Sequence, residues 1–162
     1  MKIGSKGDYG LRALIDLAEH FDSGTVVQAK EVAERQAIPK DYLALIMVDL
    51  RRAGLIESTR GPGGGYRLAR PPEAITMGEA LRLLETPVTL IDCTTELGFD
   101  GCSLSLRCRM RNVWIEANRA VMAILDRTTI ADLCTGSQPR DELLEEAESI
   151  GPDMPKGHTF HI

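Results

Sequence analysis

Hydrophobic residues recur at helical spacing in the first third of the chain and predict three successive helices. The first helix is expected to begin at Ser5, with Asp8 three residues later as its capping pair, and the second to lie around residues 29–36. Pro39 suits the first turn of a third helix, and Gly54 is a stop signal after it. The apolar face of this third helix is formed by Tyr42, Leu43, Ile46, Met47 and Leu50.

After Gly54 the spacing changes and predicts a β-hairpin. Its two strands, residues 55–59 and 66–68, flank a tip of four glycines and one proline. Three helices followed by such a hairpin are the element order of a winged helix-turn-helix domain. The sequence therefore predicts a mainly α-helical fold with a winged helix-turn-helix domain over residues 1–72.

Residues 73–136 form a second predicted unit, which contains a cysteine loop and a dimerisation helix. Thr76 and Glu79 match a capping box before a short helix. After a loop at residues 86–108, a long helix runs from about residue 109 to residue 126. Because a single long helix cannot bury its own apolar stripe, we expect it to pack against a partner subunit.

The chain is expected to end in a short helix and a tail. Thr129 and Asp132 form a second capping pair, before the last short helix. In that helix, Cys134 follows the apolar pattern and is interpreted as a core thiol. Residues 137–162 read as an acidic, partly disordered tail.

Composition first argues against a nucleic-acid partner, because the 162 residues carry a formal net charge of −5. That charge is uneven, however, since residues 51–72 contain several arginines against Glu57 alone: Arg51, Arg52, Arg60, Arg67 and Arg70. A basic stripe on a neutral domain is typical of phosphate contact, although it also fits an ordinary solvated face. No apolar run is long enough for a membrane span and no secretory signal is present, so we expect a cytoplasmic protein without a membrane partner.

The third helix and the hairpin are the candidate DNA-reading elements. Side chains near the N-terminus of such a helix reach base edges in the major groove, and arginines at its far end suit phosphates. A flexible glycine tip lets an arginine enter a narrow minor groove. A nucleotide-binding loop is the competing interpretation, but the glycines lack a following Lys-Ser/Thr pair and helix. The predicted DNA contacts are Lys40, Asp41, Tyr42, Ala44, Arg51, Arg52, Arg60, Gly63 and Gly64.

Three cysteines, Cys93, Cys102 and Cys108, lie close together in the loop before the long helix. Thiolates at such spacing can converge on one centre and select an iron–sulfur cluster or zinc over hard cations. Three thiolates leave one position of a four-ligand site open. Unlinked thiols remain an alternative from spacing alone.

The motifs resemble those of the IscR/NsrR family of winged helix-turn-helix regulators, which sense through iron–sulfur clusters. The resemblance covers residues 1–135 and rests on Ser5-Lys6-Gly7-x-Tyr9, on the wing segment LIESTRGPGGGY at residues 55–66, and on the cysteine loop leading into Arg111-x-Val113-Trp114. It implies a homodimer on a palindromic double-stranded DNA operator. It also implies that Cys93, Cys102 and Cys108 ligate a cluster, 4Fe–4S rather than 2Fe–2S.

The fourth ligand differs between branches of that family. Arg111 stands where the IscR-type branch carries a histidine, whereas Asp8 matches the aspartate that the partner subunit supplies in the NsrR-type branch. The chain departs from both branches in its first cysteine spacing, eight intervening residues rather than five. It also departs from the IscR-type branch at Ala44 and Leu45, where that branch has polar base-reading residues.

The resulting prediction is a cluster-dependent transcriptional repressor that responds to nitric oxide, redox state or iron–sulfur status. One alternative keeps the DNA-binding fold but makes the cysteines a zinc site or a thiol redox switch. Another makes the chain an iron–sulfur chaperone or electron carrier. An enzyme is not predicted, because no nucleophile–base pair or paired carboxylates converge in any motif.

Overall fold

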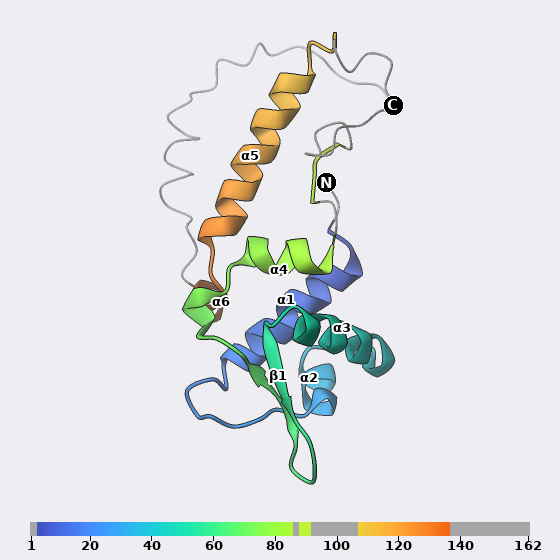
Figure 1. Ribbon diagram of the computed structural model, residues 1–162, viewed down its shortest axis with the longest axis vertical. Coiled ribbons are helices and arrows are strands. Elements are labelled where there is room, and N and C mark those ends of the chain that lie inside the picture. The colour runs from blue at the N-terminus through green and yellow to red at the C-terminus, as the bar shows by residue number, and fades with distance from the viewer. Residues whose placement is uncertain (1–2, 86–87, 92–106, 137–162) are drawn as a thin grey trace.

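The computed structural model of the protein describes residues 3–85, 88–91 and 107–136, shown in Figure 1. Their elements, in chain order, are α1 (Ser5–Ala18), α2 (Ala29–Arg35), α3 (Lys40–Arg52), β1 (Ile56–Thr59), β2 (Gly65–Leu68), the 3-10 turn η1 (Pro72–Ala74), α4 (Met77–Leu84), α5 (Arg111–Arg127) and α6 (Ile130–Thr135). This order confirms the mainly helical fold with a winged helix-turn-helix and a long later helix. No helix in the described ranges is long and apolar enough to cross a membrane.

The first three helices and the hairpin enclose a common hydrophobic core. Its central side chains come from each of these elements and are almost fully excluded from water: Leu14, Leu17, Val32, Leu43, Ile46, Met47, Leu50 and Ile56. The predicted apolar face of α3 is confirmed, with Tyr42 half-buried at its edge. Figure 1 shows the hairpin extending from this core in the direction away from α5.

The hairpin forms the wing. β1 and β2 pair antiparallel, with Ile56 opposite Leu68, and Val27 adds a short bridge through two 2.8 Å backbone hydrogen bonds with Tyr66. At the tip, Gly61 and Gly63 have φ values of 108° and 79°, a left-handed backbone that glycine adopts without steric cost. The glycine-rich tip of the wing is therefore required by its backbone path.

The beginning of α1 is capped by a residue from the later part of the chain. The backbone N–H groups of Gly4 and Gly7 donate to the carboxylate of Glu85 at 3.0 and 2.8 Å. The helix begins at Ser5 as predicted, but the predicted capping pair of Ser5 and Asp8 is wrong, because the N-cap is Gly4, which has no side chain. The Glu85 carboxylate satisfies free N–H donors and also suits the positive end of the helix dipole.

The two later capping predictions have different outcomes. Thr76 accepts a hydrogen bond from the Glu79 N–H at 3.1 Å, but the Glu79 side chain pairs with Arg70 at 2.7 Å, so the box is half formed. Thr129 and Asp132 form the complete reciprocal box that the sequence predicts. Short helices α4 and α6 are thereby fixed at their beginnings.

Helix α5 extends from the rest of the described structure as a rod, as Figure 1 shows. Of its 17 residues only Leu125, near its C-terminal end, is buried. Its main lateral attachment is to α4, where Arg82 and Asp126 form a 2.7 Å ion pair. The predicted tail at residues 137–162 lies outside the described residues.

Candidate nucleic-acid interface and sensor residues

Helix α3 presents its beginning to solvent. Ala37, in the turn from α2 to α3, has a φ of 51°, which directs the chain into the new helix. Lys40, Asp41 and Ala44 are exposed, as a reading role requires, and Lys40 forms a surface ion pair with Glu34 at 3.3 Å. Such an exposed pair contributes little to stability and leaves Lys40 free to exchange partners.

Tyr42, also a predicted DNA contact, lies between α3 and α1. Its ring packs edge-on against that of Tyr9, with ring centroids 5.8 Å apart and an interplanar angle of 77°. The guanidinium of Arg12 lies over the Tyr9 ring, 5.6 Å from its centroid. Tyr42 therefore has a packing role in this structure.

A basic groove lies between the wing, the beginning of α2 and the end of α3. This groove has a volume of about 450 Å³, and its lining includes the cationic side chains of Lys30, Arg51 and Arg60. Its lining residues, all within the described part of the chain, include no carboxylate. Arg51, at the end of α3, donates to the Ser58 hydroxyl on β1 at 3.3 Å, and this hydrogen bond holds the Arg51 side chain beside the wing. The convergence of three cations around glycine backbone is suited to a phosphodiester strand.

The sequence stripe of five arginines is divided by the structure. Arg67 pairs with Glu57 at 2.8 Å and Arg70 pairs with Glu79, so each has a carboxylate beside it, and neither lines the groove. Arg60 has no ion-pair partner among the described residues. Lys30, which sequence reasoning missed, replaces them in the groove, because the Val27 bridge brings the beginning of α2 beside the wing.

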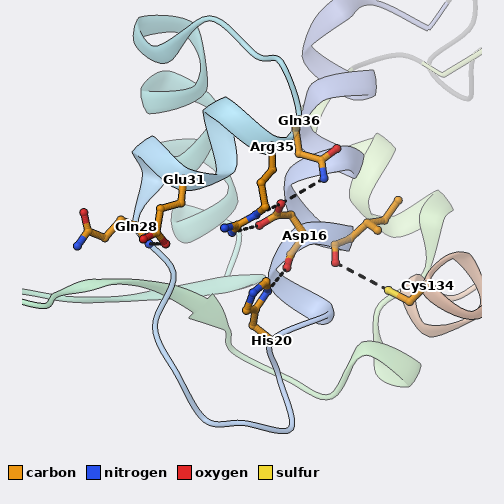
Figure 2. Close-up of polar contacts among 8 residues, drawn as sticks. Asp16, His20, Gln28, Glu31, Arg35, Gln36 and Cys134 are labelled. Atoms are coloured by element: carbon orange, nitrogen blue, oxygen red, sulfur yellow. Dashed lines mark hydrogen bonds and ion pairs between the residues drawn. The ribbon is translucent and has the colours of Figure 1, made fainter.

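A buried carboxylate joins α1 to α2. Asp16 is fully buried and receives hydrogen bonds from Arg35 at 2.8 and 3.0 Å and from Gln36 at 3.2 Å, as Figure 2 shows. Burial disfavours the charged form of Asp16, but the hydrogen bonds from Arg35 and Gln36 outweigh it and hold the pKa of Asp16 below its ordinary value. The contact fixes the C-terminal end of α2, from which the turn into α3 begins.

Arg12 connects the predicted ligand Asp8 with that same turn. Its guanidinium forms an ion pair with Asp8 at 3.5 Å and donates a hydrogen bond to the backbone carbonyl of Gln36. Asp8 itself is exposed in the first turn of α1. Arg12 is therefore the single side chain that links Asp8 to the turn between α2 and α3.

The predicted cysteine ligands are only partly within the described residues. Cys108 lies three residues before α5 and is half-buried, while Cys93 and Cys102 lie outside the described residues. Within the described ranges, no three potential metal ligands gather at one point. Cys134 packs against the core, its thiol lies 3.8 Å from the Ile15 carbonyl, and burial raises its pKa (Figure 2). This environment agrees with the prediction of a core thiol.

An exposed helix after a tight turn, beside a glycine-tipped basic wing, defines a winged-helix DNA-binding protein. The sequence model of the Rrf2 family, described as an iron-dependent transcriptional regulator, matches residues 3–136. The chain belongs to this family. It is thus a DNA-binding transcriptional regulator and not an enzyme, and the predicted resemblance to the IscR/NsrR family is confirmed at the level of the family.

Individual relatives agree with this assignment. The transcriptional regulator IscR of Aliivibrio salmonicida is 35% identical over 138 residues, which cover 85% of this chain and 80% of the relative. The structure of T. potens IscR has a TM-score of 0.65 at 34% identity and covers 97% of this chain and 94% of its own. The oxidised form of Staphylococcus aureus CymR has a TM-score of 0.66 at 35% identity, covering 83% and 96%.

Proposed function

We propose that this regulator is a cytoplasmic homodimeric repressor whose affinity for a palindromic operator is set by an iron–sulfur cluster. The basic groove between the wing and α3 carries the DNA-binding part of the proposal. Its three cations, Lys30, Arg51 and Arg60, converge without a lining carboxylate, although the whole chain has a net charge of −5. Phosphate contact depends on such local charge and not on the chain average.

In the proposed complex, α3 lies in the major groove and the wing tip reaches the minor groove. The beginning of α3 provides the base contacts at Lys40, Asp41 and Ala44, and the packing of Tyr42 against Tyr9 holds this end of the helix in place. Arg51 and Arg52 hold phosphates at its end, and Arg60 enters the minor groove beside the backbone of Gly63 and Gly64. Small glycines at the tip allow the close approach that a narrow groove requires.

The homodimer is supported by the unpartnered apolar surface of α5. Met110, Val113 and Trp114 are 63%, 66% and 39% exposed at the beginning of this helix, far from Leu125. A helix with this surface gains its stability from tertiary contacts, and the described part of one chain does not supply them. Two subunits paired through α5 would present two reading helices to the two halves of a palindrome.

The proposed cluster ligands are Cys93, Cys102 and Cys108, with Asp8 from the partner subunit as the fourth. The donor set fits, because soft thiolates hold iron–sulfur clusters, and exposed Asp8 has only a solvent-screened contact with Arg12 to exchange. A bound cluster would supply iron that nitric oxide can attack. The chain's own part is mechanical: when Asp8 is engaged elsewhere, Arg12 loses its carboxylate partner and keeps only the turn carbonyl of Gln36 and the Tyr9 ring. The state of Asp8 thus biases the turn that positions α3.

Anaerobic reconstitution with iron and sulfide tests the proposal. Wild-type protein should take up iron and sulfide in the ratio of a 4Fe–4S cluster, and Cys102→Ala should take up neither, while Cys134→Ala serves as the matched control and retains both. DNA affinity of the loaded protein should fall on exposure to nitric oxide. A colourless protein that binds its operator with full affinity would contradict the cluster-dependent mechanism.

A thiol redox switch or zinc site is the second candidate. It is favoured by the same three-cysteine set, which also suits zinc, and by the likeness to CymR, a relative whose structure has been determined in an oxidised form. Metal analysis of the reconstituted protein separates the two proposals. Zinc without iron or sulfide, or operator release by a disulfide-forming oxidant in metal-free protein, would favour the second.

A further inference from the structure

The outward face of α3 is poor in groups that read bases through directed hydrogen bonds. All 13 residues of α3 are described, and they include no asparagine, glutamine, serine or threonine, while its two arginines are the last two residues. Lys40, at the other end, carries a single ammonium group rather than a planar fork, and its exposed pair with Glu34 can exchange for another partner. The bidentate pairs that arginine forms with guanine, and asparagine or glutamine with adenine, are therefore absent from the first three turns of this helix.

In their place, an apolar side chain occupies the middle of that face. Leu45 is 64% exposed, more than any other leucine in the described ranges. The successive spacings of four, three and four residues align Asp41, Leu45, Val48 and Arg52 in one stripe along the helix, opposite the buried face. Ala44 is also exposed beside Leu45, so the two side chains form a small apolar surface between the polar ends of α3.

We propose that Leu45 is a specificity-determining residue that contacts the C5-methyl group of a thymine in each half-site, with Ala44 completing the apolar contact. The inference rests on the proposed function, in which α3 lies in the major groove. Thymine alone among the four bases presents a methyl group there, so an apolar contact distinguishes it from cytosine and distinguishes T·A from A·T. In the free protein Leu45 is exposed to water, whereas on DNA the leucine and the methyl group leave water together.

The test begins with a duplex selected by the full-length, anaerobically reconstituted protein from a pool with a randomised central segment. Each thymine of this duplex is then replaced in turn by deoxyuridine, which removes only the C5-methyl group. At one position per half-site, wild-type protein should lose affinity about fourfold, the change expected from burial of one methyl group. Leu45→Ala should bind the thymine and deoxyuridine duplexes with equal affinity, and Leu45→Met should retain the discrimination.

Leu83→Ala is the matched control, because Leu83 is also an exposed leucine, 46% accessible, but lies on α4. It should discriminate as the wild type does. The inference is overturned if no thymine shows a deoxyuridine penalty in the wild type, or if Leu45→Ala retains the full penalty, while Arg60→Ala still weakens operator binding. If no sequence is enriched and Arg60→Ala changes nothing, the DNA-reading role of α3 and the wing fails instead.

Discussion

Helices α3 and α5 differ in how much of their apolar surface is buried within the chain. Both are amphipathic, but α3 buries Leu43, Ile46, Met47 and Leu50 within its own chain, whereas α5 buries only Leu125. Helix α3 is thus held by the hydrophobic core of its own chain, with or without a partner. Helix α5 leaves Val113 and Trp114 exposed, so its stability depends on contacts beyond those that the described residues provide.

This difference separates fold stability from assembly. Substitutions on the buried face of α3 should act on unfolding of the single chain. Substitutions on the exposed face of α5 should act on association and leave the winged domain intact. If two subunits pair through α5 as proposed, the relation between their winged domains can change without loosening either domain.

The largest effect should come from Leu50→Ala. Leu50 is fully buried on α3, and truncation of such a side chain costs about 2–5 kcal/mol through lost burial and the cavity left behind. Chemical denaturation followed by circular dichroism measures the cost. Trp114→Ala on α5 should instead weaken the dimer, measured by sedimentation, with the winged domain still folded.

An exchange of effects between these two substitutions would contradict the assignment of α3 to the core and of α5 to assembly. A Trp114→Ala protein that unfolds as easily as Leu50→Ala would show that α5 belongs to the core of the single chain. A Leu50→Ala protein with an unchanged midpoint and weakened association would place the buried face of α3 at a subunit contact.

The second largest effect should come from Asp16→Asn, which removes the carboxylate that joins α1 to α2. Hydrogen bonds to a charged group contribute about 1.5–3 kcal/mol, so unfolding at neutral pH should become easier by that amount. The surface pair of Arg82 with Asp126, which attaches α5, is the matched comparison, and Arg82→Gln should cost no more than about 1 kcal/mol.

The contribution of Asp16 to stability should also depend on pH. Because the folded-state pKa of Asp16 lies below its ordinary value, its stabilisation is complete above the unfolded aspartate pKa of about 3.9 and is lost as pH falls through the folded value. Wild-type stability should therefore fall more steeply than that of Asp16→Asn in this acid range. Parallel curves would show that Asp16 does not carry the linkage.

Sequence patterns predicted the elements because each depends on local spacing. The buried face of α3, the wing and the Thr129–Asp132 box are all encoded within a few residues of one another. The capping of α1 was mispredicted because its acceptor, Glu85, lies about eighty residues away, and a local motif cannot reveal that partner.

The candidate site could also be predicted only where it depends on residues close together in the sequence. Arg60 and Arg51 followed from local charge, but the charge of Arg67 and Arg70 is cancelled by carboxylates that only strand register and helix packing bring near. Lys30 was missed because it lies outside the arginine stripe and enters the groove through the Val27 bridge. Local sequence identified the cationic side chains, but only tertiary contacts determined which of them line the groove without a carboxylate beside them.

The third effect concerns DNA affinity. Arg60→Ala should weaken specific operator binding by about 1–3 kcal/mol, and Lys30→Gln should lower the slope of log affinity against log salt by about 1, because one phosphate contact is lost. Arg119→Gln on α5 is the control, since Arg119 is exposed and paired with Glu116 at 2.7 Å. Titrations at several salt concentrations measure both quantities. An equal change in slope for Arg119→Gln would remove the distinction between the groove and α5.

The smallest expected change in stability concerns the contact between Glu85, just after α4, and the beginning of α1. Glu85→Ala removes the acceptor of the Gly4 and Gly7 N–H groups and should cost about 0.5–2 kcal/mol, as loss of a helix N-cap does. Glu116→Ala, an exposed carboxylate on α5, should change stability by less than about 0.5 kcal/mol. Amide hydrogen exchange at Gly7 should accelerate in Glu85→Ala and stay slow in Glu116→Ala. Unchanged exchange at Gly7 would mean that the first turn of α1, which carries Asp8, is held independently of the long-helix half of the chain.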